Sequence, residues 1–139
     1  MSKKITISRT AAVFFLRTLL GLIFSMQGYG KVITWGITDV YICFFQSFET
    51  ELPRILLKFT AYYTSYIELA GGVLLLIGFK TRWALYALAS VLLIVSFGHG
   101  LESPIWDLQH VMYRAMLLAG VLLLPEAWDR WSLDAMLNK

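Results

Sequence analysis

The sequence predicts an all-α integral membrane protein that crosses the bilayer as a four-helix bundle. The first observation is composition: 58% of the 139 residues are hydrophobic and only 15% are charged, whereas soluble domains carry roughly 25% charged residues. The second is the presence of four apolar segments, each near the roughly 20 residues that a helical crossing requires. These segments span residues 11–32, 55–79, 83–99 and 107–124, within a single membrane domain over residues 1–139.

The ends of the four segments carry ordinary helix signals. The first segment follows a basic stretch, but no small-residue cleavage site comes after it. We therefore expect it to be a transmembrane helix and not a signal peptide that is removed. Pro53 suits the first turn of the second segment, and Pro125 stops the fourth. The third is the shortest, but the link at residues 80–82 and the glycine-rich stretch at 98–100 give it clean ends. We therefore favour a crossing over a re-entrant loop.

The loop between the first two segments contains an aromatic stripe. Tyr41, Phe44, Phe45 and Phe48 fall at helical spacing after Asp39, which could cap a helix. This pattern predicts a short amphipathic helix in the first outside loop. We interpret it as an interfacial packing helix, the alternative being a moving lid over a ligand site.

Lys and Arg residues set the expected orientation. Cytoplasmic loops are rich in these residues, which places both termini and the link between the second and third segments in the cytoplasm. Three basic residues of the first outside loop weaken this pattern. The net charge of +3 is spread along the chain without a basic run, so it indicates membrane orientation and no nucleic-acid partner. The cytoplasmic set is Lys3, Lys4, Arg9, Lys80, Arg82, Arg130 and Lys139; the exceptions are Lys31, Arg54 and Lys58.

Ionisable residues inside the apolar segments are the main functional candidates. Arg17, Glu68 and Arg114 lie too deep to act as end anchors, and a charge in hydrocarbon is costly unless it faces the bundle interior and finds a partner. Distances along the helices predict that all three reach one layer. Small residues on the same helical faces permit close helix approach; they are Gly21, Gly28, Gly71 and Gly72.

This predicted cluster has two interpretations. It could be a buried ion-pair network that fixes helix register. It could instead line a polar pocket with excess positive charge, suited to a small anionic or acceptor-rich group. The ligand-pocket candidates are Arg17, Gln27, Glu68, His99, His110 and Arg114.

Other chemistries find little support in the sequence. His99, Glu102, Asp107 and His110 match no established metal-ligand spacing, so we expect solvated loop residues, no metal site and no haem. The single thiol, Cys43, excludes an intrachain disulfide. The sequence has no Walker-type phosphate loop, Gly-x-Gly-x-x-Gly, nucleophile elbow or His-Glu-x-x-His motif.

Four stretches of the chain resemble the DoxX family of small bacterial membrane proteins. They are residues 17–24 (RTLLGLIF), 27–31 (QGYGK), 68–82 (ELAGG through GFKTR) and 132–134 (SLD). The chain departs from the family at Gln27, where the family commonly has His. The resemblance implies a four-helix fold in the bacterial cytoplasmic (inner) membrane and a link to respiratory or sulfur redox systems, because the family name comes from components associated with quinol oxidase and thiosulfate:quinone oxidoreductase.

Two functional hypotheses follow. The first is an accessory subunit of a quinone-linked redox system, whose polar pocket opens toward the outer side. The second is a non-enzymatic scaffold or assembly protein whose buried charges are structural. No electron-carrying group is evident in the chain, which favours an accessory role without catalysis of its own. No cofactor is evident in the sequence, and the first hypothesis implies a quinone. The expected partners are the lipid bilayer and other membrane subunits or further copies of this chain.

Overall fold

A computed structural model of the chain describes residues 3–103 and 109–137. Every secondary-structure element in these two ranges is helical, as the sequence predicted. The elements are α1 (Lys3–Tyr29), the π-helical segment η1 (Gly30–Trp35), α2 (Ile37–Phe44), the 3₁₀ helix η2 (Gln46–Thr50), α3 (Arg54–Ile77), α4 (Thr81–Glu102), α5 (Gln109–Leu123), the 3₁₀ helix η3 (Glu126–Trp128) and α6 (Leu133–Leu137).

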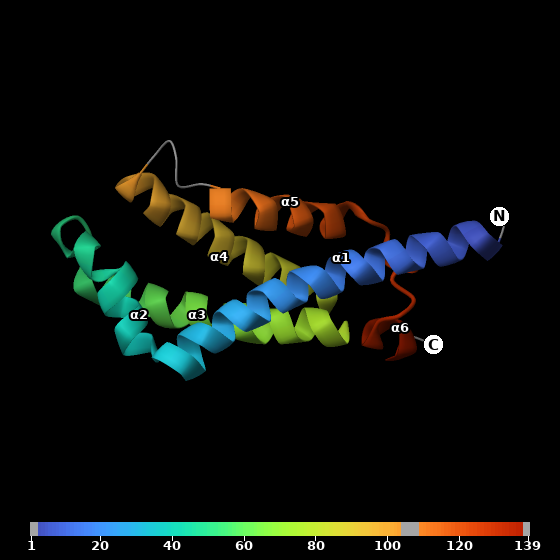
Figure 1. Ribbon diagram of the computed structural model, residues 1–139, viewed down its shortest axis with the longest axis horizontal. Coiled ribbons are helices and arrows are strands. Elements are labelled where there is room, and N and C mark those ends of the chain that lie inside the picture. Colours follow the sequence, from blue (N-terminus) through green and yellow to red (C-terminus); the bar gives the residue numbers. More distant parts are fainter. Residues whose placement is uncertain (1–2, 104–108, 138–139) are drawn as a thin grey trace.

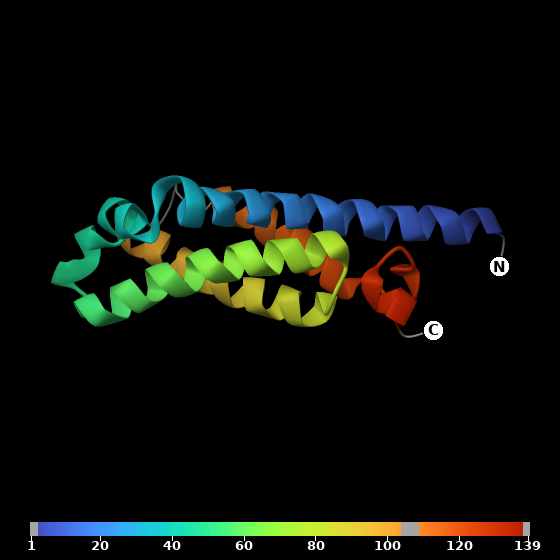
Figure 2. The same cartoon turned by 90° about the horizontal axis from the view of Figure 1, so that it is seen from below.

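The four longest helices run along one axis and give the molecule two distinct ends (Figure 1). The start of α1, the turn between α3 and α4, and α6 lie at one end, which we call the terminal end. The segments η1, α2 and η2 lie at the opposite end, which we call the far end, and Figure 2 shows the same division. The chain thus begins and ends on the same side of the bundle.

Helices α1 and α3 pack with their backbones in close contact. A β-carbon placed on Gly28 would overlap the backbone of Leu69, and one placed on Gly72 would overlap the backbone of Ser25. The predicted small-residue faces therefore meet, as in other membrane helix pairs where glycine lets backbones approach. Large side chains fill the remaining core between α1, α3 and α4; the most deeply buried are Leu20, Phe24, Leu75, Leu85 and Leu88.

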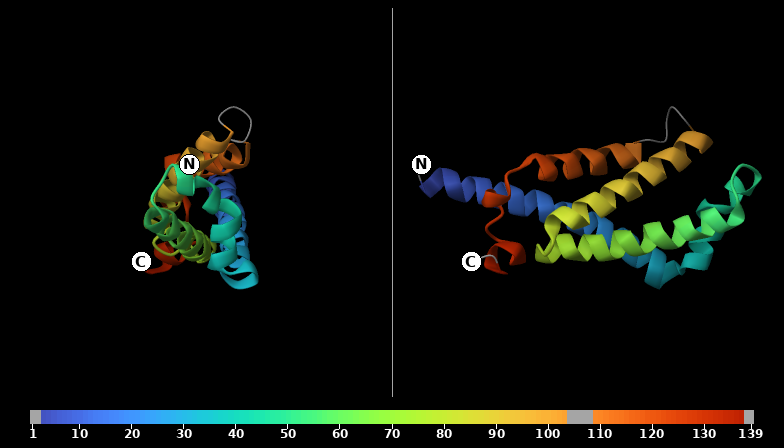
Figure 3. Two further views of the ribbon diagram at one scale, coloured as in Figure 1. Left: turned by 90° about the vertical axis from the view of Figure 1, so that its left-hand side faces the viewer. Right: turned by 180° about the vertical axis from the view of Figure 1, so that it is seen from behind.

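Helices α3 and α4 diverge from the tight turn that joins them. They are close at the terminal end and apart at the far end (Figure 3). Gly78 makes this turn possible, because it adopts φ +68°, a left-handed conformation that glycine accepts without steric cost.

Among the residues that the structure describes, three helices are long and apolar enough to cross a membrane: Thr6–Trp35, Arg54–Ile77 and Thr81–Glu102. The third is longer than the predicted 83–99, because α4 continues to Glu102. The fourth predicted segment, 107–124, contains α5, an apolar helix of 15 residues. A helix of that length extends about 22 Å, which is shorter than the hydrocarbon core of roughly 30 Å.

The aromatic stripe of the first loop does not form one helix. α2 ends at Phe44, and Phe48 belongs to the separate helix η2. Asp39 lies in the first turn of α2, whereas the residue before the helix is Gly36 with φ +82°. The predicted Asp39 cap and continuous helix are therefore wrong: glycine starts α2, and the chain turns at Phe45 so that Phe45 and Phe48 pack beside Leu57 and Ala61.

Candidate functional site

The far end of the bundle contains a cavity of about 540 Å³. Most of its wall is apolar and comes from α2, η2, α3 and α4. The wall residues include Val40, Phe44, Phe48, Leu57, Leu93 and Phe97. The charged and amide-bearing groups that line the cavity are Gln27, Lys31, Glu68, His99, Glu102 and Arg114.

Lys31 and Glu68 form a buried ion pair at this cavity. The Lys31 Nζ lies 2.7 Å from Oε2 of Glu68, and the Glu68 side chain is only 1% exposed. Neither carboxylate oxygen of Glu68 receives a well-aligned hydrogen bond from the described part of the chain. A buried carboxylate normally accepts several such bonds. Glu68 can therefore accept further hydrogen bonds from a group in the cavity.

Arg114 lies at the same cavity and is held by two neighbours. Its Nη1 donates to Oε1 of Gln27 at 2.7 Å, and its Nε donates to the backbone carbonyl of His110 at 2.6 Å. Within residues 3–103 and 109–137 no protein acceptor is bonded to its Nη2. The Glu68 carboxylate also attracts Arg114 electrostatically. We call Gln27, Lys31, Glu68 and Arg114 the polar cluster.

The polar cluster has an excess of positive charge and of donors. It holds two cations and one anion, while the second acid at the cavity, Glu102, is exposed. Lys31 Nζ carries three N–H donors and Arg114 five, more than the contacts above use. A group rich in acceptors is the chemical complement of this arrangement.

Four of the six predicted pocket residues line the cavity, namely Gln27, Glu68, His99 and Arg114. Arg17 and His110 do not, although the backbone of His110 supports Arg114. Asp107 of the proposed metal set lies outside the described residues. In the described ranges, no three His, Cys, Asp or Glu side chains gather as metal ligands.

Residues 12–101 of the chain match the sequence model of the DoxX family. The chain belongs to the DoxX family. The match runs from α1 through α4 and includes Gln27, Lys31 and Glu68, whereas Arg114 lies beyond it. No curated protein and no solved structure matches the chain.

Gln27 has a defined task in this DoxX protein, because its amide oxygen orients Arg114. A neutral imidazole could accept the same hydrogen bond through its unprotonated nitrogen. Compared with the His that the family resemblance implies at this position, Gln27 keeps an acceptor for Arg114 and does not titrate near neutral pH.

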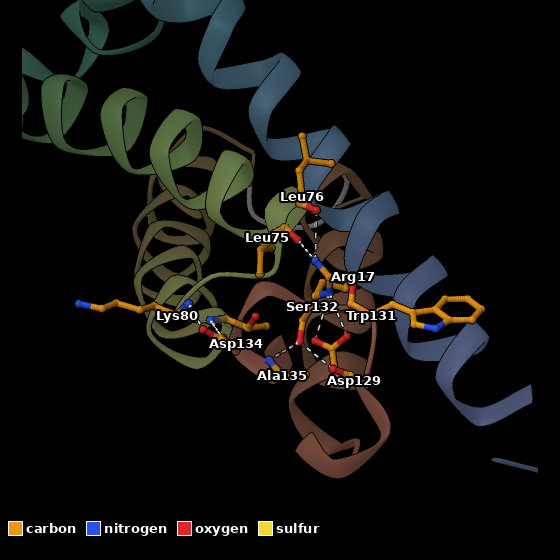
Figure 4. A network of polar contacts seen from close by, with 10 residues as sticks. Arg17, Leu75, Leu76, Lys80, Asp129, Trp131, Ser132, Asp134 and Ala135 are labelled. Atoms are coloured by element: carbon orange, nitrogen blue, oxygen red, sulfur yellow. Dashed lines mark hydrogen bonds and ion pairs between the residues drawn. The ribbon is translucent and has the colours of Figure 1, made fainter. Parts of the chain in front are cut away.

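Arg17 of the DoxX chain lies at the terminal end, beside the residues that follow α5 (Figure 4). Its Nε pairs with Asp129 at 3.2 Å, its Nη2 donates to the Trp131 carbonyl at 3.0 Å, and its Nη1 donates to the carbonyls of Leu75 and Leu76. The predicted single layer is therefore wrong for Arg17. The antiparallel register places Gly28 beside Leu69, and Gly28 is about 17 Å from Arg17 along the helix.

The residues after α5 fasten the terminal end of this DoxX bundle. Oδ1 and Oδ2 of Asp134 accept hydrogen bonds from the backbone N–H groups of Lys80 and Thr81 at 2.8 and 2.9 Å, and so cap α4 from a distant part of the chain (Figure 4). The Asp134 N–H donates to the Gly78 carbonyl at 2.9 Å. The tail thus folds onto the α3–α4 turn and supplies the only acidic partner that Arg17 has among the described residues.

Sequence reasoning missed Lys31 and Asp129 as charge partners. Lys31 lies at the end of the predicted segment 11–32 and shares a helical face with Gly28, which is a usable signal, but the orientation argument counts it with the basic residues of the first outside loop. The π-helical segment η1 instead continues α1 and carries Lys31 to Glu68. Asp129 is separated from Arg17 by 112 positions, and no local pattern joins the two.

Proposed function

We propose that this DoxX protein is an accessory membrane subunit of a quinone-linked redox system, and that its far-end cavity holds the head group of the quinone. The observation that carries the proposal is the polar cluster in a cavity whose wall is mostly apolar. Ligand sites of this kind are mostly apolar with a few placed polar groups. The proposed role is one of binding and positioning, without catalysis of its own.

The chemistry of the polar cluster suits a quinone. A quinone ring carries two carbonyl acceptors and no net charge, so it can receive hydrogen bonds from Arg114 and Lys31. The aromatic and aliphatic walls offer contact to the ring. DoxX membership supports a redox role, because the family name comes from components associated with quinol oxidase and thiosulfate:quinone oxidoreductase.

The proposal includes four crossings and a defined orientation. α5 would complete the fourth crossing in a locally thinned bilayer, because a hydrophobic helix shorter than the hydrocarbon core is accommodated in this way. The basic residues at the terminal end would place both termini in the cytoplasm. The far-end cavity would then lie in the outer half of a bacterial inner membrane.

A scaffold role is the second candidate, and a specific observation favours it. Among the described residues, each buried charge has a protein partner: Arg17 contacts Asp129, Glu68 contacts Lys31, and Arg114 contacts Gln27. Such contacts fix helix register without any ligand.

Thermal shift in mild detergent separates the two candidates. A ligand that binds only the folded state stabilises it by about 2.7 kcal/mol at one hundred times its Kd. We expect quinones to raise the melting temperature of the parent with concentration. Arg114→Lys should weaken this response, because an ammonium lacks the planar guanidinium fork.

Arg17→Lys is the matched control. It lowers the starting melting temperature, since Arg17 is buried, but it should leave the quinone-dependent rise intact. If no quinone or small oxyanion shifts the parent, and crosslinking shows a carboxylate of another subunit beside Arg114, the scaffold role stands instead.

A further inference from the structure

The opposing faces of α3 and α4 are joined by a hydrogen bond near mid-helix and separate beyond it. The Tyr63 and Ser90 hydroxyls lie 2.8 Å apart and link the two helices. On α4, the face that carries Ser90 continues through Ile94 and Phe97 to Leu101 at helical spacing. These side chains therefore point toward the side on which α3 lies.

The outer part of this face is uncovered although it belongs to the interhelical side. Phe97 is 60% exposed and Leu101 is 41% exposed, and both line the cavity. On α3 the matching face runs from Tyr63 through Thr60 to Leu56, which lines the cavity and is 47% exposed. The helices diverge at this level (Figure 3). The cavity thus opens sideways between α3 and α4.

We infer that the cavity of this DoxX protein is entered laterally from the bilayer, and that its occupant is a lipid-dissolved molecule whose hydrocarbon tail lies between α3 and α4. The inference rests on the proposed function, because it needs a ligand in the cavity, and it adds the class and route of that ligand. A lateral opening lined by Leu56, Phe97 and Leu101 meets acyl chains, which are as apolar as these side chains. The acceptor-bearing head then reaches the donors Lys31 and Arg114 without crossing open water.

Three features make a tailed molecule the favoured occupant over a second protein chain. The opening leads inward to a cavity of about 540 Å³, which a flat helix contact would not fill. The apolar lining continues from the exposed edge to the buried Leu57. The buried charged groups of the cavity are Glu68 and Arg114, and Arg114 carries more N–H donors than its contacts with Gln27 and His110 use. A tailed molecule would place its hydrocarbon tail at the exposed apolar opening and its polar head at the buried charged groups.

Photolabelling in vesicles tests the route directly. The protein is placed in phosphatidylcholine vesicles that contain a phosphatidylcholine with a diazirine on one acyl chain. Labelled residues are then identified by mass spectrometry after illumination. We expect label on Val40 and Leu57, which are buried but line the cavity, and no label on Leu20 and Leu75, which are buried elsewhere in the core.

A pair of tryptophan variants makes the test specific to the opening. Leu56 and Leu22 are both 47% exposed, but only Leu56 lines the cavity. Leu56→Trp should narrow the entrance and lower the labelling of Val40 several-fold, whereas Leu22→Trp should leave it unchanged. Label confined to exposed residues in the parent, equal effects of the two variants, or a crosslinked protein chain at Leu101 would each overturn the inference.

Competition distinguishes this inference from the proposed function. If decylubiquinone lowers the Val40 label, both stand. If the label persists at all quinone concentrations, the lateral route stands and the quinone assignment fails. If a small oxyanion stabilises the parent while Val40 stays unlabelled, the cavity binds a ligand but not by this route.

Discussion

The Lys31–Glu68 pair shows how one contact can dominate the energetics of a membrane site. Glu68 is almost fully buried, whereas the Lys31 side chain is 23% exposed. A lysine that loses its partner can extend toward the interface and keep its charge hydrated. A glutamate in the bundle interior has no such escape. Glu68 therefore depends on Lys31 for charge compensation more than Lys31 depends on Glu68.

We predict that Lys31→Met destabilises the protein by about 3 kcal/mol, near the lower end of the range for a broken buried ion pair, because Arg114 still attracts Glu68. The double variant Lys31→Met with Glu68→Gln should recover most of this loss, since it removes the unpaired charge. Unfolding titrations with a denaturing detergent measure both. Lys58→Met, an exposed change at the same end, is the control.

A double variant that is as unstable as the two single losses added together would contradict an ion-pair role. In that case Lys31 and Glu68 would contribute independently, and the short Nζ to Oε2 distance would carry little coupling energy.

At the scale of elements, α2 and η2 cover one side of the cavity and are tied to the start of α3. Glu49 of η2 accepts a hydrogen bond from the Tyr41 hydroxyl at 2.5 Å and from Arg54 Nη2 at 2.7 Å. Both hydrogen bonds lower the pKa of Glu49 below its ordinary value of 4.5, and the bond from Arg54 has the larger effect. Of the three basic residues that weakened the predicted orientation, Arg54 and Lys31 are thus paired with acids.

We predict that the packing of α2 and η2 over the cavity, which we call the cover, is weakened at acid pH. A lowered pKa means that the ionised Glu49 stabilises the fold, that this contribution is complete above pH 4.5, and that it is lost as the pH falls through the lowered pKa. The melting temperature of the parent should fall more steeply below pH 4.5 than that of Glu49→Gln. Glu51→Gln, at an exposed neighbouring position, should keep the parent profile. Identical profiles for the parent and Glu49→Gln would show that the cover is held by its apolar contacts alone.

At the scale of the whole molecule, the two ends differ in their balance of charge. The far end carries the exposed acids Asp39, Glu51 and Glu102 together with Arg54 and Lys58, whereas basic residues outnumber acids at the terminal end. This asymmetry agrees with the positive-inside rule.

The orientation yields a labelling prediction. Cys43 is exposed at the far end, so a membrane-impermeant maleimide added outside intact cells should modify it. Arg130→Cys in a Cys43→Ser background should react only after the membrane is opened, because residue 130 is exposed at the terminal end. The reverse pattern would invert the proposed topology, and labelling of both positions from outside would contradict a bundle that spans the membrane.

Much of the fold could be predicted from the sequence, because hydropathy and glycine placement act locally. The apolar segments, the all-helical class and the facing of Gly28 and Gly72 all follow from short patterns. The charge partners did not follow, since a helical face gives the direction of a side chain around the axis but not its height along the neighbouring helix. That height is set by the contact of Gly28 with Leu69, which assigns Glu68 to one end and Arg17 to the other.

The contact between Arg17 and Asp129 has a consequence for biosynthesis. Ribosomes deliver Arg17 112 residues before its carboxylate partner, so α1 enters the membrane while its guanidinium has no acidic counterpart from the tail. We expect Arg17 of the nascent helix to stay near the interface until Asp129 has been synthesised. The bundle is then completed by the residues made last. Chains that stop before Asp129 therefore lack the acidic partner of Arg17, and we expect their bundles to be incompletely packed at the terminal end.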